Sequence, residues 1–279
     1  MREIVLVGSP NVGKSVIFNC LNGKYVSVSN YPGTTVEIAR GYSRLGGASC
    51  EVVDTPGLYS LLAMTNEERV TREFLINQKP DVVIHVADAK NIRRMLNFTL
   101  ELMDAGLPVV LNLNLMDEAA AAGVSIDSAL LAEALGIPVV TTAATKGIGV
   151  AELKNVIGEY TGSKTKPFSF SVAIEEAIKH ISSKLAGEYG LSRRIIALLL
   201  LQGDEAIHAL VKRESRYKDI QGDIAVAAAR YRDPLAFVIA MERQGIVDGL
   251  LELSVRFGVP RRGGIADWLD RLTRQPITG

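Results

Sequence analysis

Residues 8–15 carry the most specific chemical signal in the chain, because they form the motif G-x-x-x-x-G-K-S. The apolar run Ile4–Val7 before them predicts a strand, and residues 16–21 after them predict a helix. In this context the two glycines let main-chain N–H groups wrap closely around a phosphate chain. Lys14 is expected to reach the β- and γ-phosphates, and the Ser15 hydroxyl is expected to ligate Mg²⁺. An ordinary glycine turn is the alternative, which the strand–loop–helix context disfavours.

A second motif, D-T-P-G at residues 54–57, carries a carboxylate and follows the predicted strand at residues 51–53. The Asp54 carboxylate can hold Mg²⁺ through water, and the Gly57 N–H can contact a γ-phosphate. Alone, the motif is equally compatible with a simple turn. Its position after the second apolar run of the chain favours the nucleotide site.

Two threonines lie in the loop N-Y-P-G-T-T at residues 30–35, between the predicted first helix and a predicted hairpin. A loop threonine at this point can ligate Mg²⁺ and sense the γ-phosphate, so that loss of the phosphate releases the loop. The sequence alone leaves the choice between Thr34 and Thr35 open. An ordinary polar loop is the alternative interpretation.

A guanine-reading motif is predicted at residues 114–117, which read N-L-M-D and end a predicted strand. Asp117 offers two acceptors that match the N–H groups of guanine and repel adenine. Leu115 stands where the usual N-K-x-D pattern has lysine, so we expect modest nucleotide affinity. Backbone N–H groups in T-A-A-T-K, residues 142–146, can contact the guanine carbonyl. The alternative for Asp117 is a helix N-cap.

Alternating strand and helix patterns fill the first part of the chain and predict a mainly parallel sheet covered by helices, with one antiparallel edge strand added by a Gly46-Gly47 hairpin. Ligands on such sheets bind at the carboxyl ends of the strands, where the motifs above fall. The predicted strands are 3–7, 41–45, 50–53, 82–87, 109–114 and 137–141. The predicted helices are 67–77, 93–105, 128–135 and 150–160.

A composition shift at residues 162–167, Gly-Ser-Lys-Thr-Lys-Pro, predicts a linker, after which helical patterns dominate. Asp204 and Asp233 suit N-caps, and Pro234 suits a first helical turn. We therefore expect an α/β domain over residues 1–162 and an all-α domain over residues 167–260. The predicted helices of the second domain are 174–185, 192–201, 204–213, 219–230 and 234–257.

Bulk composition limits the classes of function. Lys plus Arg and Asp plus Glu each total 31, so the chain is formally neutral and gives no support to general nucleic-acid binding. Cys20 and Cys50 lack metal-site spacing and are expected to be free thiols in a reducing compartment. The N-terminus predicts a strand rather than a leader, and the longest notable apolar run has seven residues, which together favour a cytoplasmic location.

The motif order is that of Ras-like GTPases, and longer stretches resemble the cytosolic G domain of the ferrous iron transport protein B (FeoB) family. The stretches that carry the resemblance are N-Y-P-G at residues 30–33, D-T-P-G-L-Y-S-L at 54–61, E-E-R-V at 67–70 and N-L-M-D-E-A at 114–119. The resemblance is strong over residues 1–162. Residues 167–260 are similar in position and length to the family's helical spacer domain, and residues 261–279 resemble the approach to its membrane region.

The resemblance implies GTP and GDP as ligands, with Mg²⁺ and K⁺ as cofactors. It implies that Thr35 is the Mg²⁺ ligand of switch I and that Asn11 helps to hold K⁺ near the phosphates. It also implies that the helical domain tunes nucleotide release and relays the switch state. The implied partners are the transporter's own membrane domain and small accessory Feo proteins, with the parent protein in the prokaryotic inner membrane. A homo-oligomer stays an open alternative.

Leu58 occupies the position where many Ras-like proteins have a water-orienting glutamine. Because leucine cannot hold a water molecule by hydrogen bonding, we expect slow GTP hydrolysis, stimulated more by K⁺ than by Na⁺. Two other functions remain as alternatives. One is a switch in which hydrolysis serves only as a timer, and the other is a stand-alone GTPase acting on the ribosome or RNA, against which the neutral charge counts.

The predicted site residues fall into three sets. Catalytic roles are predicted for Lys14, Asn11, Thr35 and Gly57. Nucleotide contacts are predicted for Gly8, Asn11, Val12, Gly13, Lys14, Ser15, Val16, Gly33, Thr34, Thr35, Asp54, Gly57, Asn114, Asp117, Thr142, Ala143 and Ala144. Metal ligation is predicted for Ser15, Thr35 and Asp54 with Mg²⁺ and for Asn11 with K⁺.

Overall fold

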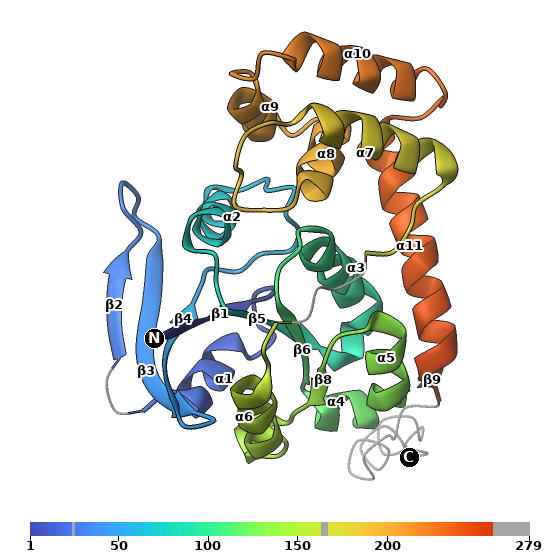
Figure 1. Ribbon diagram of the computed structural model, residues 1–279. Helices are drawn as coiled ribbons and strands as arrows, with labels where there is room; N and C mark the ends of the chain where they lie inside the picture. Colours follow the sequence, from blue (N-terminus) through green and yellow to red (C-terminus); the bar gives the residue numbers. More distant parts are fainter. Residues whose placement is uncertain (24–25, 163–166, 259–279) are drawn as a thin grey trace, which may run out of the picture.

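The structure is a computed structural model that describes residues 1–23, 26–162 and 167–258. Its centre is a seven-stranded sheet with the strand order β2-β3-β4-β1-β5-β6-β8 (Figure 1). Strand β3 is antiparallel to both of its neighbours, and every other pair in the sheet is parallel. The strands are β1 (Arg2–Val7), β2 (Val26–Asn30), β3 (Glu37–Leu45), β4 (Ala48–Asp54), β5 (Val82–Asp88), β6 (Val109–Asn114) and β8 (Val139–Thr141).

The central strands are apolar at consecutive positions because helices cover both faces of the sheet. All six residues of β6 and the first six of β5 are buried, which is typical of parallel strands packed on two sides. Helices α1 and α6 pack against each other, while α3 covers β5 and β6. These helices are α1 (Lys14–Leu21), α2 (Asn66–Gln78), α3 (Ile92–Asp104), α4 (Met116–Ala121), α5 (Ser128–Leu135) and α6 (Val150–Glu159).

The remaining helices form a second layer of structure beyond α2 and α3, at one end of the molecule (Figure 1). They are α7 (Val172–Lys184), α8 (Arg193–Leu201), α9 (Glu205–Val211), α10 (Tyr217–Ala228) and α11 (Leu235–Ser254). Helix α11 packs along α3 and α5 and so runs back beside the sheet. It ends in β9 (Val255–Phe257), which pairs antiparallel with β7 (Val124–Ile126).

The predicted architecture is confirmed: a mainly parallel sheet with an antiparallel component, followed by an all-α region. Two details were not predicted. The edge of the sheet is β2, so the antiparallel strand β3 lies one place inside it. The last residues of the predicted helix 234–257 form β9 instead, because they pair with β7.

The structure confirms one of the three predicted helix-start features and corrects the other two. The carboxylate of Asp204 accepts a hydrogen bond from the Ile207 N–H at 2.9 Å, so this N-cap is confirmed. Asp233 is not the N-cap of α11, because Pro234 takes that position with an extended backbone and no side-chain cap. Pro234 therefore lies just before the first helical turn rather than in it.

No helix among the described residues is long and apolar enough to span a membrane. The two cysteines are free, with Cys50 buried and Cys20 half-buried. The predicted linker falls partly, and the predicted tail 261–279 wholly, outside the described residues.

Candidate functional site

The loop between β1 and α1 has positive φ angles at three positions, which restricts the residue types that it can contain. Gly8 and Gly13 have φ angles of 154° and 84°, and Asn11 has 65°, a left-handed conformation that asparagine adopts more readily than most residues. A Cβ on Gly8 would lie 2.3 Å from the Val86 carbonyl oxygen, and one on Gly13 would lie 2.3 Å from Asn114 Nδ2. Both glycines are therefore required by close packing as well as by the backbone angles.

Lys14 and Ser15 meet the carboxylate of Asp54 at the carboxyl ends of β1 and β4. The Lys14 ammonium pairs with Asp54 and also donates to the Thr55 carbonyl oxygen. The Ser15 hydroxyl donates to the other Asp54 oxygen at 3.0 Å. The structure thus brings together the cation and the hydroxyl at the start of α1 and the carboxylate at the end of β4, the groups predicted for a metal–phosphate site, although Ser15 and Asp54 are 39 positions apart in sequence.

The two threonines of the loop after β2 have different environments. The Thr34 hydroxyl donates to the Tyr31 carbonyl oxygen at 2.9 Å and accepts from the Val36 N–H at 3.2 Å, so it is used within its own turn. The Thr35 side chain is exposed and lines a cleft of about 850 Å³ beside the β1–α1 loop. This geometry favours Thr35 over Thr34 as the threonine that faces a ligand.

The cleft contains most of the residues predicted for the phosphate side. Asn11, Gly13, Lys14, Ser15, Val16, Thr35, Asp54 and Gly57 all line it. Sequence reasoning missed five wall residues outside the predicted motifs, namely Val28, Val36, Glu37, Ala39 and Glu67. The alternating residues of β2 were the signal that could have placed Val28.

The segment after Asp54 lies directly against the β1–α1 loop. A Cβ on Gly57 would lie 2.7 Å from Pro10 Cγ, so glycine is needed for this approach. The Leu58 N–H donates to the Gly8 carbonyl oxygen at 3.0 Å, while the Leu58 side chain is fully buried in the core. No side chain at position 58 therefore enters the cleft.

Asn114 joins three loops at the other end of the site. Its Nδ2 donates to the Val12 carbonyl oxygen at 3.0 Å, and its Oδ1 accepts from the Thr142 hydroxyl at 3.0 Å and the Ala144 N–H at 3.2 Å. The side chain is 1% exposed. These contacts leave one Nδ2 hydrogen for a ligand, so Asn114 fixes the relative position of the loops in addition to any contact with a base.

Asp117, in the first turn of α4, keeps its carboxylate partly exposed and accepts an ion pair from Lys146 Nζ at 2.7 Å. The hydrogen bond from Lys146 lowers the pKa of the Asp117 carboxyl below its usual value. Leu115, before α4, has a φ of 61°. The predicted base-side residues 114, 117 and 142–144 thus lie together, next to the cleft but outside its lining.

Two histidines and two methionines of the described residues lie in packed or hydrogen-bonded positions away from the cleft. His85 is fully buried on β5, and burial lowers its pKa to about 3. His208 contacts the Tyr217 hydroxyl and the Leu200 carbonyl oxygen. Met95 and Met103 are buried in α3. No group of three or more metal-binding side chains occurs among the residues that the structure covers.

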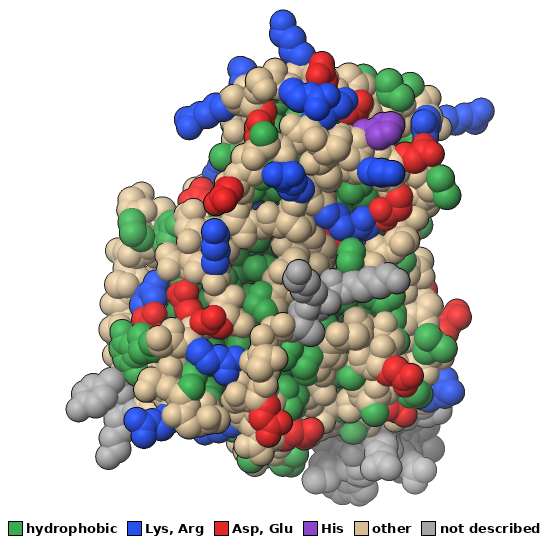
Figure 2. Space-filling view, in the orientation of Figure 1, with side chains coloured by type: hydrophobic (Ala, Val, Ile, Leu, Met, Phe, Trp, Pro, Cys, Tyr) green, Lys and Arg blue, Asp and Glu red, His purple; other side chains and the backbone are tan. Residues whose placement is uncertain are grey.

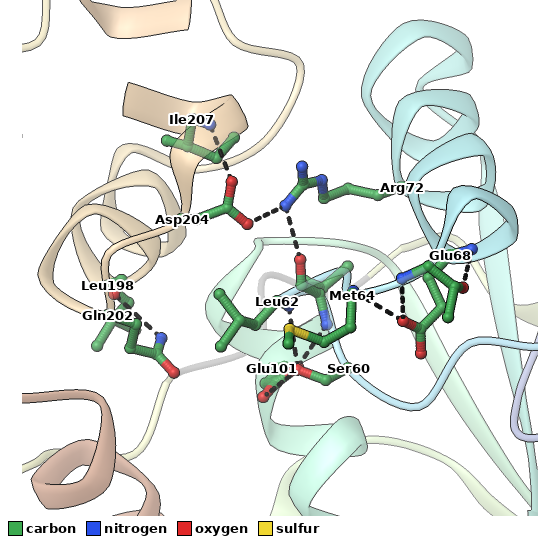
Figure 3. Close-up of polar contacts among 12 residues, drawn as sticks. Ser60, Leu62, Met64, Glu68, Arg72, Glu101, Leu198, Gln202, Asp204 and Ile207 are labelled. Carbon is green, nitrogen blue, oxygen red and sulfur yellow. Dashed lines mark hydrogen bonds and ion pairs between the residues drawn. The ribbon is translucent and has the colours of Figure 1, made fainter. Parts of the chain in front are cut away.

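Segment 58–65, which follows the D-T-P-G motif, is held by buried charged side chains (Figure 3). Glu68, 6% exposed, accepts from the Met64 N–H at 2.9 Å and the Thr65 N–H at 3.1 Å. Glu101 of α3 accepts from the Ser60 hydroxyl at 2.8 Å and the Leu61 N–H at 2.7 Å. Two carboxylates thereby hold the segment at four residues, one carboxylate at residues 60 and 61 and the other at residues 64 and 65.

Two arginines extend this network into the helical region. Arg72 of α2 donates to the Leu61 carbonyl oxygen at 3.0 Å and pairs with Asp204 at the start of α9 (Figure 3). Arg243 of α11 donates to Glu101 at 2.8 Å. All four charged side chains are at most 8% exposed. The N–H and the C=O of Leu61 are therefore each bonded to a buried ion pair whose other half comes from the helical region.

Surface charge is mixed on the face shown in Figure 2, where basic and acidic side chains are interspersed over the sheet region and the helical region alike. This distribution agrees with the formal neutrality of the chain.

Comparisons with known proteins give a consistent result. The family model described as "Ferrous iron transport protein B" matches residues 2–157, and the "FeoB cytosolic helical domain" matches residues 170–256. The fusion protein of Fe(2+) transport protein A and Fe(2+) transporter FeoB from Porphyromonas gingivalis is 32% identical over 298 residues. That alignment covers 99% of this chain but 35% of the relative, so the chain spans about a third of the relative's length.

Two solved structures have the same fold over nearly the whole chain. A variant of S. thermophilus NFeoB bound to GDP aligns with a TM-score of 0.83 at 29% identity, covering 92% of this chain and all of that one. S. thermophilus NFeoB bound to GDP.AlF4⁻ and K⁺ aligns with a TM-score of 0.78 at 30% identity, covering 90% and 100%. With the matched motifs, the sheet topology and the helical region in agreement, the chain belongs to the ferrous iron transport protein B family.

Proposed function

We propose that the chain binds GTP and GDP with Mg²⁺ and hydrolyses GTP slowly, as the cytosolic regulatory part of a ferrous iron transporter. The observation that carries the proposal is the meeting of Lys14, Ser15 and Asp54 at the end of a glycine loop. A helix N-terminus, main-chain N–H groups and the Lys14 ammonium at one edge of a parallel sheet suit a phosphate chain. The S. thermophilus relatives bound to GDP and to GDP.AlF4⁻ support the same ligand class.

The donor set fits Mg²⁺, which prefers oxygen ligands. Ser15 would ligate the ion directly and Asp54 through water, and the exposed Thr35, which lines the same cleft, would join them. When bound, Mg²⁺ neutralises phosphate charge and polarises the phosphoryl group. Lys14 would leave Asp54 and move to the phosphates, so the carboxylate becomes available to the ion as the ammonium becomes available to the nucleotide.

Guanine would be selected by Asp117, Asn114 and the amides of residues 142–144. The exposed carboxylate of Asp117 offers both oxygens to the N1 and N2 hydrogens of guanine. Asn114 keeps one Nδ2 hydrogen for a ligand, whereas the Ala143 N–H donates to the Ile148 carbonyl oxygen at 3.1 Å and the Ala144 N–H to Asn114 at 3.2 Å, so these amides would have to exchange partners to contact the base. With Leu115 in place of lysine, the affinity for GDP is expected to be micromolar.

Hydrolysis is expected to be slow because Leu58 is buried and offers no group to the attacking water. Transition-state charge then depends on Lys14, the main-chain amides and a cation near Asn11. Asn11 lines the cleft with its side chain exposed, so its amide oxygen is accessible to K⁺. Gly57, with Pro10 packed against it, presents the main-chain N–H expected to contact the γ-phosphate.

The partner and location assignments rest on the family. Residues 1–162 would act as the G domain and residues 167–260 as the helical domain that follows the switch state. The remaining length of the relatives would provide the membrane domain in the prokaryotic inner membrane. The P. gingivalis relative that is fused to Fe(2+) transport protein A supports a small accessory Feo protein as a partner.

The first test is titration of the purified chain with a fluorescent GDP analogue in Mg²⁺, with unlabelled GTP and ATP as competitors. Micromolar binding displaced by GTP and not by ATP is expected. Preference for ATP would overturn the proposal, and nanomolar GDP binding would contradict the role given to Leu115.

The second test is turnover in K⁺ and in Na⁺ for the wild type, Asn11→Ala, Thr35→Ala and the matched variant Thr34→Ala. Asn11→Ala should remove the advantage of K⁺, and Thr35→Ala should weaken the Mg²⁺ dependence. Thr34→Ala should change neither. Equal turnover in both salts for all four proteins would remove the K⁺ assignment.

A further inference from the structure

We propose that Lys146 is a positioning residue for guanine selectivity, which holds the Asp117 carboxylate in the orientation that reads the base. The inference rests on the proposed nucleotide function and deepens it. Lys146 Nζ lies 2.7 Å from Asp117 Oδ2, although the two residues come from different loops, one after β6 and one after β8.

The backbone of the loop that carries Lys146 is held by its own hydrogen bonds, and the exposed Lys146 side chain extends from it to Asp117. The Lys146 N–H donates to the Ala143 carbonyl oxygen at 2.9 Å, and Ala143 and Ile148 form a two-way backbone bridge at 3.1 and 3.3 Å. Gly149, at a φ of 76°, closes the loop against β8, because a Cβ there would lie 2.0 Å from the Thr141 carbonyl oxygen. A lysine on such a loop loses little additional backbone freedom when it forms an ion pair.

The same short loop contacts both side chains that are expected to read guanine. The Ala144 N–H in this loop donates to Asn114 at 3.2 Å, and Lys146 pairs with the carboxylate expected at the N1 and N2 hydrogens. A carboxylate has about four lone-pair sites, so Asp117 can keep Lys146 on one of them and still accept two hydrogen bonds from guanine. The pair therefore orients the carboxylate without blocking it.

The neighbouring acidic residue has a lysine of its own. Glu118, next to Asp117 on α4, pairs with Lys90 from the short helix η1 (Ala89–Asn91). Because Lys90 engages Glu118, only Lys146 among the described lysines forms an ion pair with Asp117. This separation supplies a matched control, since Lys90→Ala removes a positive charge that pairs with the same helix α4 without releasing Asp117.

The position of Lys146 also suits a site that lacks the lysine of N-K-x-D. Leu115 offers no charge to this end of the site and is held in a left-handed backbone conformation at the start of α4. Lys146 approaches from the facing loop and supplies the charge there instead. Its hydrogen bond keeps Asp117 ionised, as guanine recognition requires.

The experiment compares the affinities of the full chain for GDP and for IDP, which lacks the 2-amino group that Asp117 would read. In the wild type, GDP should bind more tightly than IDP. Lys146→Ala should weaken GDP binding about twofold to fivefold, the range of a partly exposed ion pair. The same variant should reduce the difference in affinity between GDP and IDP, because a misoriented carboxylate loses its contact with the 2-amino group of guanine. Lys146→Arg should restore most of the GDP affinity and most of the difference in affinity between GDP and IDP.

Each other outcome has a defined meaning. Lys90→Ala should leave the ratio of GDP to IDP affinity unchanged, and an equal effect of both lysines would reduce the role of Lys146 to general charge. Unchanged GDP affinity in Lys146→Ala, or tighter binding, would overturn the inference. In the background Asp117→Asn, a further loss on removing Lys146 would also contradict it. Absence of GDP binding in the wild type would instead refute the proposed function itself.

Discussion

The two segments that border the phosphate side of the cleft are held in opposite ways. In residues 31–36 the hydrogen bonds that shape the turn come from the segment itself: Thr34 bonds to Tyr31 and Val36, and the Tyr31 N–H bonds to the Val36 carbonyl oxygen. A cleft of about 680 Å³ separates this turn from α2. Residues 58–65, in contrast, are bonded to buried charged side chains of α2 and α3.

The difference teaches which segment can change at low cost. The first can reorganise by exchanging its own hydrogen bonds for others or for water, with little effect on the rest of the molecule. The second cannot leave its position without breaking hydrogen bonds to buried ion pairs that include Asp204 and Arg243 of the helical region. Movement of the second segment is therefore coupled to the helical region, and movement of the first is not.

The largest predicted effect comes from breaking the second arrangement with Arg72→Met. This change leaves the Asp204 carboxylate buried without its cation and removes a donor from the Leu61 carbonyl oxygen. We expect unfolding to become easier by about 3–5 kcal/mol, measured by urea denaturation. The exposed Arg69 of the same helix gives the control, because Arg69→Met should change stability by less than about 0.5 kcal/mol. Equal effects at both positions would mean that the buried pair is unimportant.

A smaller effect is expected for Glu101→Gln. The amide oxygen can still accept from Ser60 or Leu61, but the negative charge beside Arg243 is lost. A destabilisation of about 1.5–3 kcal/mol is expected. Hydrogen exchange should show faster opening of residues 58–65 and unchanged exchange in residues 31–36. If both segments open alike, the comparison between them is wrong.

Acid should destabilise the fold through His85, which packs under α3, the helix that carries Glu101. This ring is fully buried under α3, contacts the Thr99 hydroxyl at 2.9 Å, and has a pKa lowered to about 3 by burial. The folded protein keeps the ring neutral while the unfolded chain takes up a proton below pH 6.5, so its contribution to stability is complete above pH 6.5 and is lost as the pH falls towards 3. At pH 5 the loss should be about 2 kcal/mol.

The measurement compares urea midpoints at pH 7 and pH 5 for the wild type and His85→Gln. Burial also raises the pKa of the Glu3 and Asp104 carboxyls, but these groups titrate in both proteins. The difference in pH dependence between the wild type and the variant therefore reports on the histidine alone. A variant that loses as much stability as the wild type between the two pH values would contradict the assignment.

The smallest effect should come from the first segment. Thr34→Val keeps the side-chain volume and removes both hydrogen bonds of the hydroxyl group in the turn. The free energy of unfolding should fall by about 0.5–1.5 kcal/mol. Because the turn is partly exposed, water can replace the lost partners, and a value near the lower end is expected. The urea midpoint gives the measurement, and a loss as large as that of Arg72→Met would refute the local nature of the turn.

Features whose interacting residues are close in sequence were predicted, and features that depend on residues distant in sequence were not. The glycine loop and the D-T-P-G turn are local patterns, and each fixes its own backbone. Strand β2 was missed although Val26-Ser27-Val28-Ser29 alternates, because five exposed residues give a weak signal. Residues 255–257 were assigned to a helix since only pairing with β7 makes them a strand.

The charged network could not be predicted, because its partners are 132 and 142 residues apart and no local pattern joins them. The choice of Thr35 over Thr34 likewise depended on the turn geometry, which identical neighbouring residue types do not reveal. Lys146 was visible in the sequence as part of T-A-A-T-K, but its ion pair with Asp117 requires the folded positions of two loops.

The short ladder between β7 and β9 has a mechanical consequence. Strand β9 is antiparallel to β7, and the Gly258 N–H donates to the Gly123 carbonyl oxygen at 2.7 Å, two residues after α4 ends. Tension applied to the polypeptide beyond residue 258 would load this ladder first. The force would therefore act next to α4, the helix that bears Asp117, before it acted on the helices at the far end of the molecule.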